Sequence, residues 1–250
     1  MLALENMMKM AFIMRNNDME ITVDNISVIV NTKSKKSIFN NNNNLNYYSI
    51  DKVKDEVRGF LYFDLKNNKW VFCGLLQKKL NSINYINKIE NLVLLLESPH
   101  KDEYDVYGNP LRPANGRTGT NINNLFAKQI NNNNLIINTL QNNIAYRVWI
   151  VNAIQYQTSG FNQLHALGQI YTQSWRIVRN NVFKTLWKKE TIFNLQADLV
   201  HRLNQIAPSI IINCVTGGKN KNGLRMLVEN GLQNHNLKSS ALYYHPSYWK

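Results

Sequence analysis

The stretch LVLLLESPHKDEY, Leu92–Tyr104, decides the fold and raises the question of function. Five apolar residues run directly into Glu97, and Asp102, Glu103 and Asp105 follow within eight positions. A short apolar run of this kind is typical of a parallel strand covered on both faces. In an open parallel sheet, ligands bind beyond the carboxyl ends of the strands. The stretch therefore predicts a buried strand that delivers carboxylates to a ligand-binding edge.

Three further segments have the same apolar texture on both faces: Tyr146–Ala153, Ser209–Val215 and Ala241–His245. Helical patterns separate them, at Thr120–Ile130, at Gln163–Trp187, in TIFNLQADLVHRLNQIAP and in NGLRMLVENG, which Gly231 closes. Alternating strands and helices predict an α/β domain. We expect a three-layer α/β/α domain over residues 86–250, with a central, mostly parallel, four-stranded sheet.

Residues 1–85 have a different pattern. Glu20–Val30 alternates weakly, and VRGFLYFDLKNNKWVFCGLL predicts a hairpin that turns at Asn67–Asn68. We expect a β-rich accessory segment of unknown role. Two asparagine tracts, Asn40–Asn44 and Asn131–Asn134, read as a linker or loop and as an insertion between elements.

The chain is strongly basic, with a formal net charge of +13 at pH 7 and a pI near 9.7. Downstream of Asp105, fifteen lysines and arginines stand against three acids, Glu190, Asp198 and Glu229. Such a balance favours a polyanionic partner, nucleic acid before an anionic membrane, and a solvated basic surface is the equal alternative.

The cysteines, Cys73 and Cys214, are too few for a disulfide framework, a four-cysteine zinc site or an iron–sulfur cluster. The first residues, interrupted by Glu5 and Lys9, lack the apolar core of a signal peptide, and no run reaches the length of a membrane span. We expect a cytoplasmic protein without a metal or cofactor.

Polar residues follow each predicted strand: Glu97-Ser98-Pro99-His100, Asn152, Gly217-Gly218-Lys219 and His245-Pro246-Ser247. Each has an ordinary structural reading. Glu97 would cap a turn, the acidic run would be a solvated loop, and the glycines would form a turn. Only the set, at one edge of the predicted sheet, indicates a site.

In these motifs the chain resembles the uracil-DNA glycosylase superfamily, in particular the branch whose first motif is Gly-Glu-x-Pro-Gly followed by an acidic pair. Glu97 and Glu103 in LESPHKDE match the two family glutamates. Asn109–Phe126 is similar to the family's Arg-Pro-Phe segment and glycine-rich helix entry, and Asn152 and His245-Pro246-Ser247 match the later motifs. The resemblance spans Asn91 to the C-terminus and leaves residues 1–90 outside.

Several positions depart from the family pattern. The four iron–sulfur cysteines are missing. His100 stands where that branch has glycine and other members have a tyrosine, Leu111 stands near the phenylalanine that stacks on uracil, and Ser98 stands where some members carry a catalytic aspartate. With Pro99, these residues form the expected base pocket, and their changes imply a uracil or a modified pyrimidine as the substrate base.

The resemblance implies a DNA glycosylase that flips a nucleotide out of the stack and hydrolyses its N-glycosidic bond. Asn152 would read the base edge, His245 would stabilise the departing base, and Glu97 or Glu103 would orient water and offset the sugar cation. Residues expected to contact DNA are Arg117 with the helix start Gly116–Thr120, Lys219, Ser247, Tyr248 and Trp249 as wedges, and Lys250.

Repair and defence against phage DNA with modified bases both remain open. A non-catalytic nucleic-acid-binding protein on the same fold is the main alternative. A hydrolase of free nucleosides or nucleotides is a weaker one, because the basic excess is large for so small a substrate.

Overall fold

The computed structural model describes residues 52–74, 83–105, 109–155, 158, 179–180, 183–184, 186–187, 194–216 and 223–250, and the backbone of four strands between residues 10 and 41. Those four strands, β1 (Met10–Arg15), β2 (Asp18–Val23), β3 (Ile26–Asn31) and β4 (Lys36–Asn41), pair in sequence order as an antiparallel sheet. Most of the helical pattern expected at Gln163–Trp187 lies outside the described residues.

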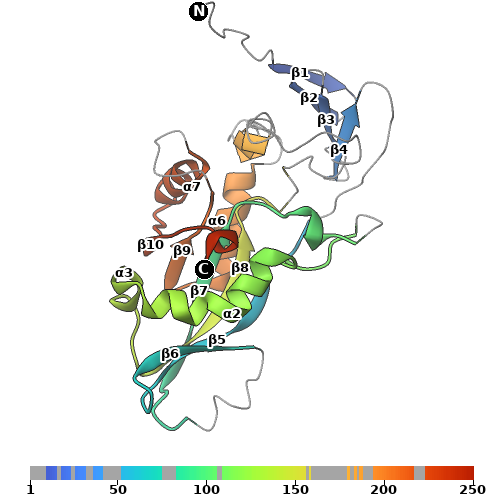
Figure 1. Cartoon of the computed structure of the whole chain (residues 1–250). Helices are drawn as coiled ribbons and strands as arrows, with labels where there is room; N and C mark the ends of the chain where they lie inside the picture. The colour runs from blue at the N-terminus through green and yellow to red at the C-terminus, as the bar shows by residue number, and fades with distance from the viewer. Residues whose placement is uncertain are drawn as a thin grey trace, which may run out of the picture.

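The larger sheet is mixed, with six strands in the order β10-β9-β7-β8-β5-β6 (Figure 1). Its four parallel strands are the predicted ones: β7 (Lys88–Leu96), β8 (Ile144–Asn152), β9 (Ile210–Asn213) and β10 (Ala241–Leu242). The α/β class is thus confirmed. The expected four-stranded sheet is too small, because two antiparallel strands extend it beyond β8.

The extra strands are the predicted hairpin, β5 (Glu56–Asp64) and β6 (Lys69–Cys73), which turns through residues 65–68. β5 pairs antiparallel with β8, from Glu56 opposite Ile150 to Leu61 opposite Tyr146. Residues 56–73 therefore belong to the α/β sheet, and the boundary predicted at residue 85 is wrong for this segment. A hairpin pattern shows where the chain turns but not which distant strand it will join.

Helices pack on both faces of this sheet (Figure 1). Leu92, Leu94 and Leu96 of β7 pack with α2 (Arg117–Asn131) and α3 (Asn134–Ile137). Val93 and Leu95 point to the other face, where they pack with α6 (Leu195–Ile206) and α7 (Leu224–Gln233). The alternation of side chains along one strand thus buries β7 completely, as its unbroken apolar sequence predicted.

Gly231 was expected to close the last helix, but it lies inside α7. A Cβ at this position would come within 2.7 Å of the Trp187 ring. Gly231 therefore makes room for the Trp187 ring and does not end the helix.

The tract Asn131–Asn134 links α2 to α3 and has specific contacts. The side chain of Asn131 bonds the backbone of Trp70 in β6, accepting at 2.9 Å and donating at 2.9 Å. Asn133 caps α3 by accepting from the backbone N–H groups of Leu135 and Ile136. Within the described residues, no helix is long and apolar enough to cross a membrane.

Candidate active site

Glu97 and Asn152 lie side by side because β7 and β8 are parallel and end in register. Leu96 pairs with Asn152, and the bonding continues beyond the strands, from Ala153 N to Leu96 O at 2.9 Å and from Ile154 N to Glu97 O at 3.1 Å. The expectation that these two residues share one sheet edge is confirmed.

Glu103, on a 3-10 turn (Lys101–Glu103) after β7, joins the same site. The Asn152 side-chain Nδ2 donates to Glu103 Oε2 at 3.2 Å, and the backbone N–H of His100 donates to Oε1 at 3.2 Å. Burial raises the pKa of the Glu103 carboxyl to about 7, although these two donors and the N–H of Ala114 favour the charged form. Glu103 therefore titrates near neutral pH.

Glu97 is also buried, and its Oε1 forms an ion pair with Arg179 Nε at 3.2 Å. Burial raises the pKa of Glu97, against the Arg179 charge and a bond from the backbone N–H of Thr216. Two buried acceptors of the site, Glu97 Oε2 and Asn152 Oδ1, have no hydrogen-bond partner among the described residues. Buried polar atoms are rarely left so, and a bound ligand or water is a common reason.

His245 follows β10, whose last residues run beside the end of β9. Its Nδ1 accepts the backbone N–H of Ser247 at 3.3 Å and lies 2.9 Å from the Ser247 hydroxyl. A backbone N–H only donates, so Nδ1 carries no proton and the neutral ring carries it on Nε2. Burial, followed by the charges of Arg179, Arg225 and His100, lowers the pKa of His245 to about 4. His245 is thus a neutral donor through Nε2.

A strained loop holds Glu103 from the other side. Ala114 has φ 53°, the left-handed region that alanine occupies at a cost of about 1–2 kcal/mol. Arg58 in β5 fixes this loop, donating from Nη2 to the carbonyls of Pro113 and of Ala114, the latter at 3.0 Å. Gly119 of α2 gives the Ala114 carbonyl its space, since a Cβ there would lie 1.7 Å from that oxygen. Arg58 therefore positions the Ala114 N–H that reaches Glu103.

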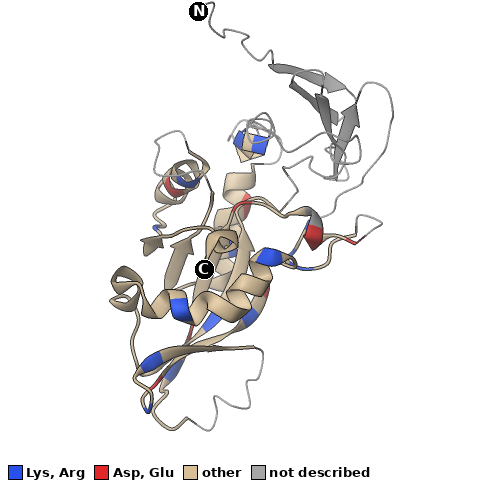
Figure 2. Ribbon diagram, in the orientation of Figure 1, with Lys and Arg blue, Asp and Glu red and all other residues tan. Residues whose placement is uncertain are grey.

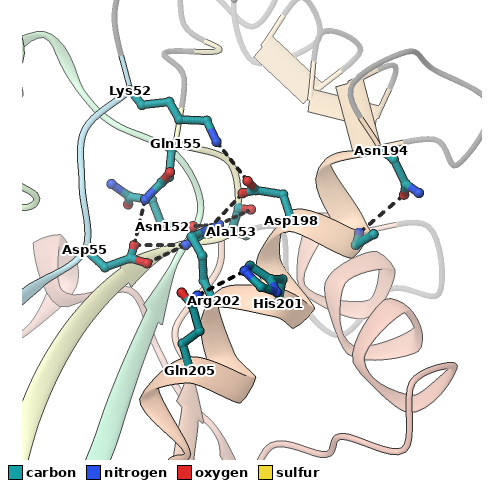
Figure 3. A network of polar contacts seen from close by, with 11 residues as sticks. Lys52, Asp55, Asn152, Ala153, Gln155, Asn194, Asp198, His201, Arg202 and Gln205 are labelled. Carbon is teal, nitrogen blue, oxygen red and sulfur yellow. Dashed lines mark hydrogen bonds and ion pairs between the residues drawn. The ribbon is translucent and has the colours of Figure 1, made fainter.

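A second network fixes the end of β8 (Figure 3). Arg202 Nη2 donates to the carbonyls of Asn152 at 3.0 Å and Ala153 at 3.3 Å. Its Nη1 meets both carboxylate oxygens of Asp55 at 2.9 and 2.8 Å, and its Nε bonds Asp198 at 2.9 Å. Lys52 completes the network by pairing with Asp198 at 2.8 Å. The segment before β5 is thereby tied to the backbone that carries Asn152.

The residues expected to line the base pocket differ in exposure. The Ser98 hydroxyl lies 2.8 Å from the Thr158 hydroxyl, and Pro99 is buried. The His100 imidazole is exposed and lies 3.4 Å from the Asp102 carboxylate, and Leu111 is 53% exposed. Ser98 and Pro99 are thus parts of the packed edge, whereas His100 and Leu111 are accessible.

Among the residues expected to contact DNA, Arg117, Tyr248 and Lys250 are exposed, and Lys219 lies outside the described residues. Ser247 holds the His245 ring. Trp249 was expected to wedge into DNA, but it is buried and stacked on Phe126 of α2, with ring centroids 6.0 Å apart. The wedge prediction is therefore wrong for Trp249, whose ring fills the core.

Sequence reasoning missed Arg58, Arg179, Arg202 and Asp55. None of them follows a strand or belongs to a recognisable motif, and each acts through a contact formed only in the folded chain. No family model, curated protein or solved structure matches the chain. The function proposed below therefore depends on the geometry of the site and on the motifs at its strand ends.

Proposed function

We propose that the protein is a DNA glycosylase that hydrolyses the N-glycosidic bond of a flipped-out uracil or modified pyrimidine and leaves an abasic site. One observation carries the proposal. Glu97, Asn152 and His245 lie at or just after the carboxyl ends of the parallel strands β7, β8 and β10. Among the described residues, two buried acceptors there, Glu97 Oε2 and Asn152 Oδ1, have no partner, and His245 offers a neutral imidazole donor.

This set suits the charges that develop in the reaction. As the bond between C1′ and the base nitrogen breaks, its electron pair leaves with the base and the sugar becomes cationic. Nε2–H of His245 would donate to a base carbonyl oxygen, where negative charge grows. Oδ1 of Asn152 would accept an N–H from the base edge.

Glu97 is the better candidate for the carboxylate that acts on water. Both oxygens of Glu103 already accept N–H groups, from His100 and Asn152, whereas Oε2 of Glu97 has no described partner. Glu97 would orient a water toward C1′ and take up its proton as the new C–O bond forms. Glu103 would then act as a positioning residue for Asn152.

The rest of the chain supports this enzyme class. Helices on both faces of the sheet support the three-layer α/β/α arrangement, and the basic excess supports DNA as the substrate. Cys73 and Cys214 form no disulfide with each other, which supports a reducing, cytoplasmic location. The altered base pocket supports repair and defence against modified phage DNA equally.

The test is an incubation with oligonucleotides that carry U, T, 5-hydroxymethyl-C or glucosylated 5-hydroxymethyl-C, followed by alkali to cleave abasic sites. We expect cleavage with one of these bases, lost in Glu97→Gln and His245→Ala with DNA binding retained. His235→Ala, which removes an exposed imidazole after α7, is the matched control and should keep activity. DNA binding without abasic product from any base would contradict the proposal and favour a non-catalytic DNA-binding protein. Release of the base from mononucleotides as fast as from DNA would favour a nucleoside hydrolase.

A further inference from the structure

A groove runs between the β5–β6 hairpin and α2, on the face of the sheet that α2 covers. It consists of two adjacent cavities, of about 810 and 390 Å³, which share Phe72 and Asn123 in their walls. We call it the β6–α2 groove. It lies outside the proposed catalytic set, since none of Glu97, Asn152 or His245 lines it.

The charges along the β6–α2 groove are mainly positive. Arg112 lines the smaller cavity together with one acid, Glu56, and with Arg58, which is buried and bonded to the Ala114 carbonyl. Lys69 and Lys128 line the larger cavity. Both lysines are exposed. Figure 2 shows lysines and arginines in blue on α2 and on the β5–β6 hairpin. A row of cations of this kind fits the phosphates of a nucleic acid backbone.

The walls between these cations offer aromatic and amide groups. Phe63 and Phe72 are partly exposed, and each is held by an aromatic neighbour, Phe63 by Trp70 at 5.4 Å and Phe72 by Phe126 at 5.3 Å between ring centroids. Asparagines from both walls add donors and acceptors: Asn68, Asn123, Asn124, Asn132 and Asn142. Cations that follow a backbone, combined with aromatic rings on which bases stack, are the features that bind single strands.

The near end of the groove adjoins the loop that holds Glu103. Arg112 follows Leu111 directly, and Arg58 bonds the carbonyls of Pro113 and Ala114. From this end the groove follows α2 toward Lys128.

We propose that the β6–α2 groove binds one unpaired DNA strand that flanks the flipped nucleotide, and that the protein therefore prefers single-stranded or locally opened DNA. This inference rests on the proposed function, because it takes the substrate of the site to be DNA. In this arrangement β6 of the hairpin supplies one wall of the track that the strand would follow.

The test measures binding of the full chain to fluorescent single-stranded 12-mers, single-stranded 4-mers and 12-base-pair duplexes over a range of salt concentrations. The variant is Lys69→Gln/Lys128→Gln, and the matched control is Lys238→Gln, an exposed lysine after α7 on the opposite face. We expect the double variant to weaken binding of the single-stranded 12-mer about tenfold and to reduce the slope of log K against log salt by about 1.4, which corresponds to two phosphate contacts. The 4-mer and the control variant should change little.

Unchanged 12-mer affinity in the double variant, or an equal loss in Lys238→Gln, would overturn the groove proposal. So would an equal loss of affinity for the duplex, because the track would then not be specific for an unpaired strand. None of these results bears on base excision by the wild-type protein, which is measured separately. A failure of the groove proposal can therefore be told from a failure of the proposed function. A wild-type protein that binds no DNA would overturn both.

Discussion

The side-chain amide of Asn152 donates to the Glu103 carboxylate at 3.2 Å, across 49 positions of sequence, and its carbonyl oxygen is left without a described partner. Glu103 thereby fixes which end of the amide is occupied and which is available. The acceptor end is the one that a base N–H would use. Glu103 would therefore contribute to recognition of the base indirectly, by orienting the Asn152 amide.

Because Glu103 acts through Asn152, we expect their substitutions to be non-additive. Asn152→Ala and Glu103→Ala should each lower kcat/KM for base excision, and the double variant should lose little more than the worse single variant. A coupling free energy of about 1–3 kcal/mol in the double-mutant cycle would show this. Strictly additive losses would mean that Glu103 contributes on its own.

The pH dependence of excision should follow the buried carboxyls of Glu103 and Glu97, whose pKa values burial raises, and not His245. The raised pKa of Glu103, about 7, means that its carboxylate gains a proton as the pH falls through 7 and loses the charge that holds the Asn152 amide. The pKa of His245, lowered to about 4, keeps its imidazole neutral above pH 5. We therefore expect kcat/KM to fall on the acid side of pH 7.

The control for this profile is His245→Gln, which should lower the rate while keeping the midpoint near 7. Removal of an imidazole donor should cost about 3–4 kcal/mol of transition-state stabilisation. A wild-type profile with a midpoint near 6.5 that disappears in His245→Gln would show instead that the imidazole titrates during function.

The Arg202 network should be required for stability as well as for activity. Arg202→Gln leaves the buried Asp55 carboxylate without its bidentate partner and releases the carbonyl of Asn152. We expect the free energy of unfolding in urea to fall by about 3–5 kcal/mol at pH 7. Asp55→Asn/Arg202→Gln should be less unstable than Arg202→Gln alone, since no buried charge is left unpaired. If Asp55→Asn/Arg202→Gln has a lower free energy of unfolding than Arg202→Gln, the unpaired Asp55 carboxylate is not the cause of the lost stability.

Trp249 and Tyr248 should differ sharply, although they are neighbours in the sequence. Trp249 is 6% exposed and stacks on Phe126, so Trp249→Ala should lower the free energy of unfolding by about 3–5 kcal/mol. Tyr248 is 66% exposed, so Tyr248→Ala should leave unfolding unchanged and weaken DNA binding. Equal effects of the two substitutions on unfolding would contradict this division.

The sequence predicted those parts of the fold that local pattern controls. The unbroken run Leu92–Leu96 is a buried strand, the spacing of Leu195, Leu199, Leu203 and Ile206 is the buried face of α6, and Asn67–Asn68 lies in the turn of a hairpin. Each follows from the period of side chains along one element or from turn chemistry.

Features that depend on pairing between distant segments were not predictable in this way. β5 joins β8, which lies more than eighty residues further along the chain, and Gly231 makes room for Trp187 rather than ending a helix. For the site, the strand pattern predicted that Glu97 and Asn152 lie at neighbouring strand ends and that His245 follows the last parallel strand, as the pairing of β7 with β8 and of β10 with β9 shows. Their supports, Arg58, Arg179 and Arg202, come from segments whose sequence does not distinguish them from other basic residues.

The most direct measurement is mass spectrometry of the oligonucleotide and the released base after incubation with the wild-type protein and with Glu97→Gln. We predict that the wild-type protein yields one free pyrimidine base and an uncut strand with a single abasic sugar, and that Glu97→Gln yields neither. An unchanged oligonucleotide for every base tested, or a cut backbone with all bases still attached, would contradict a hydrolytic site built from Glu97, Asn152 and His245.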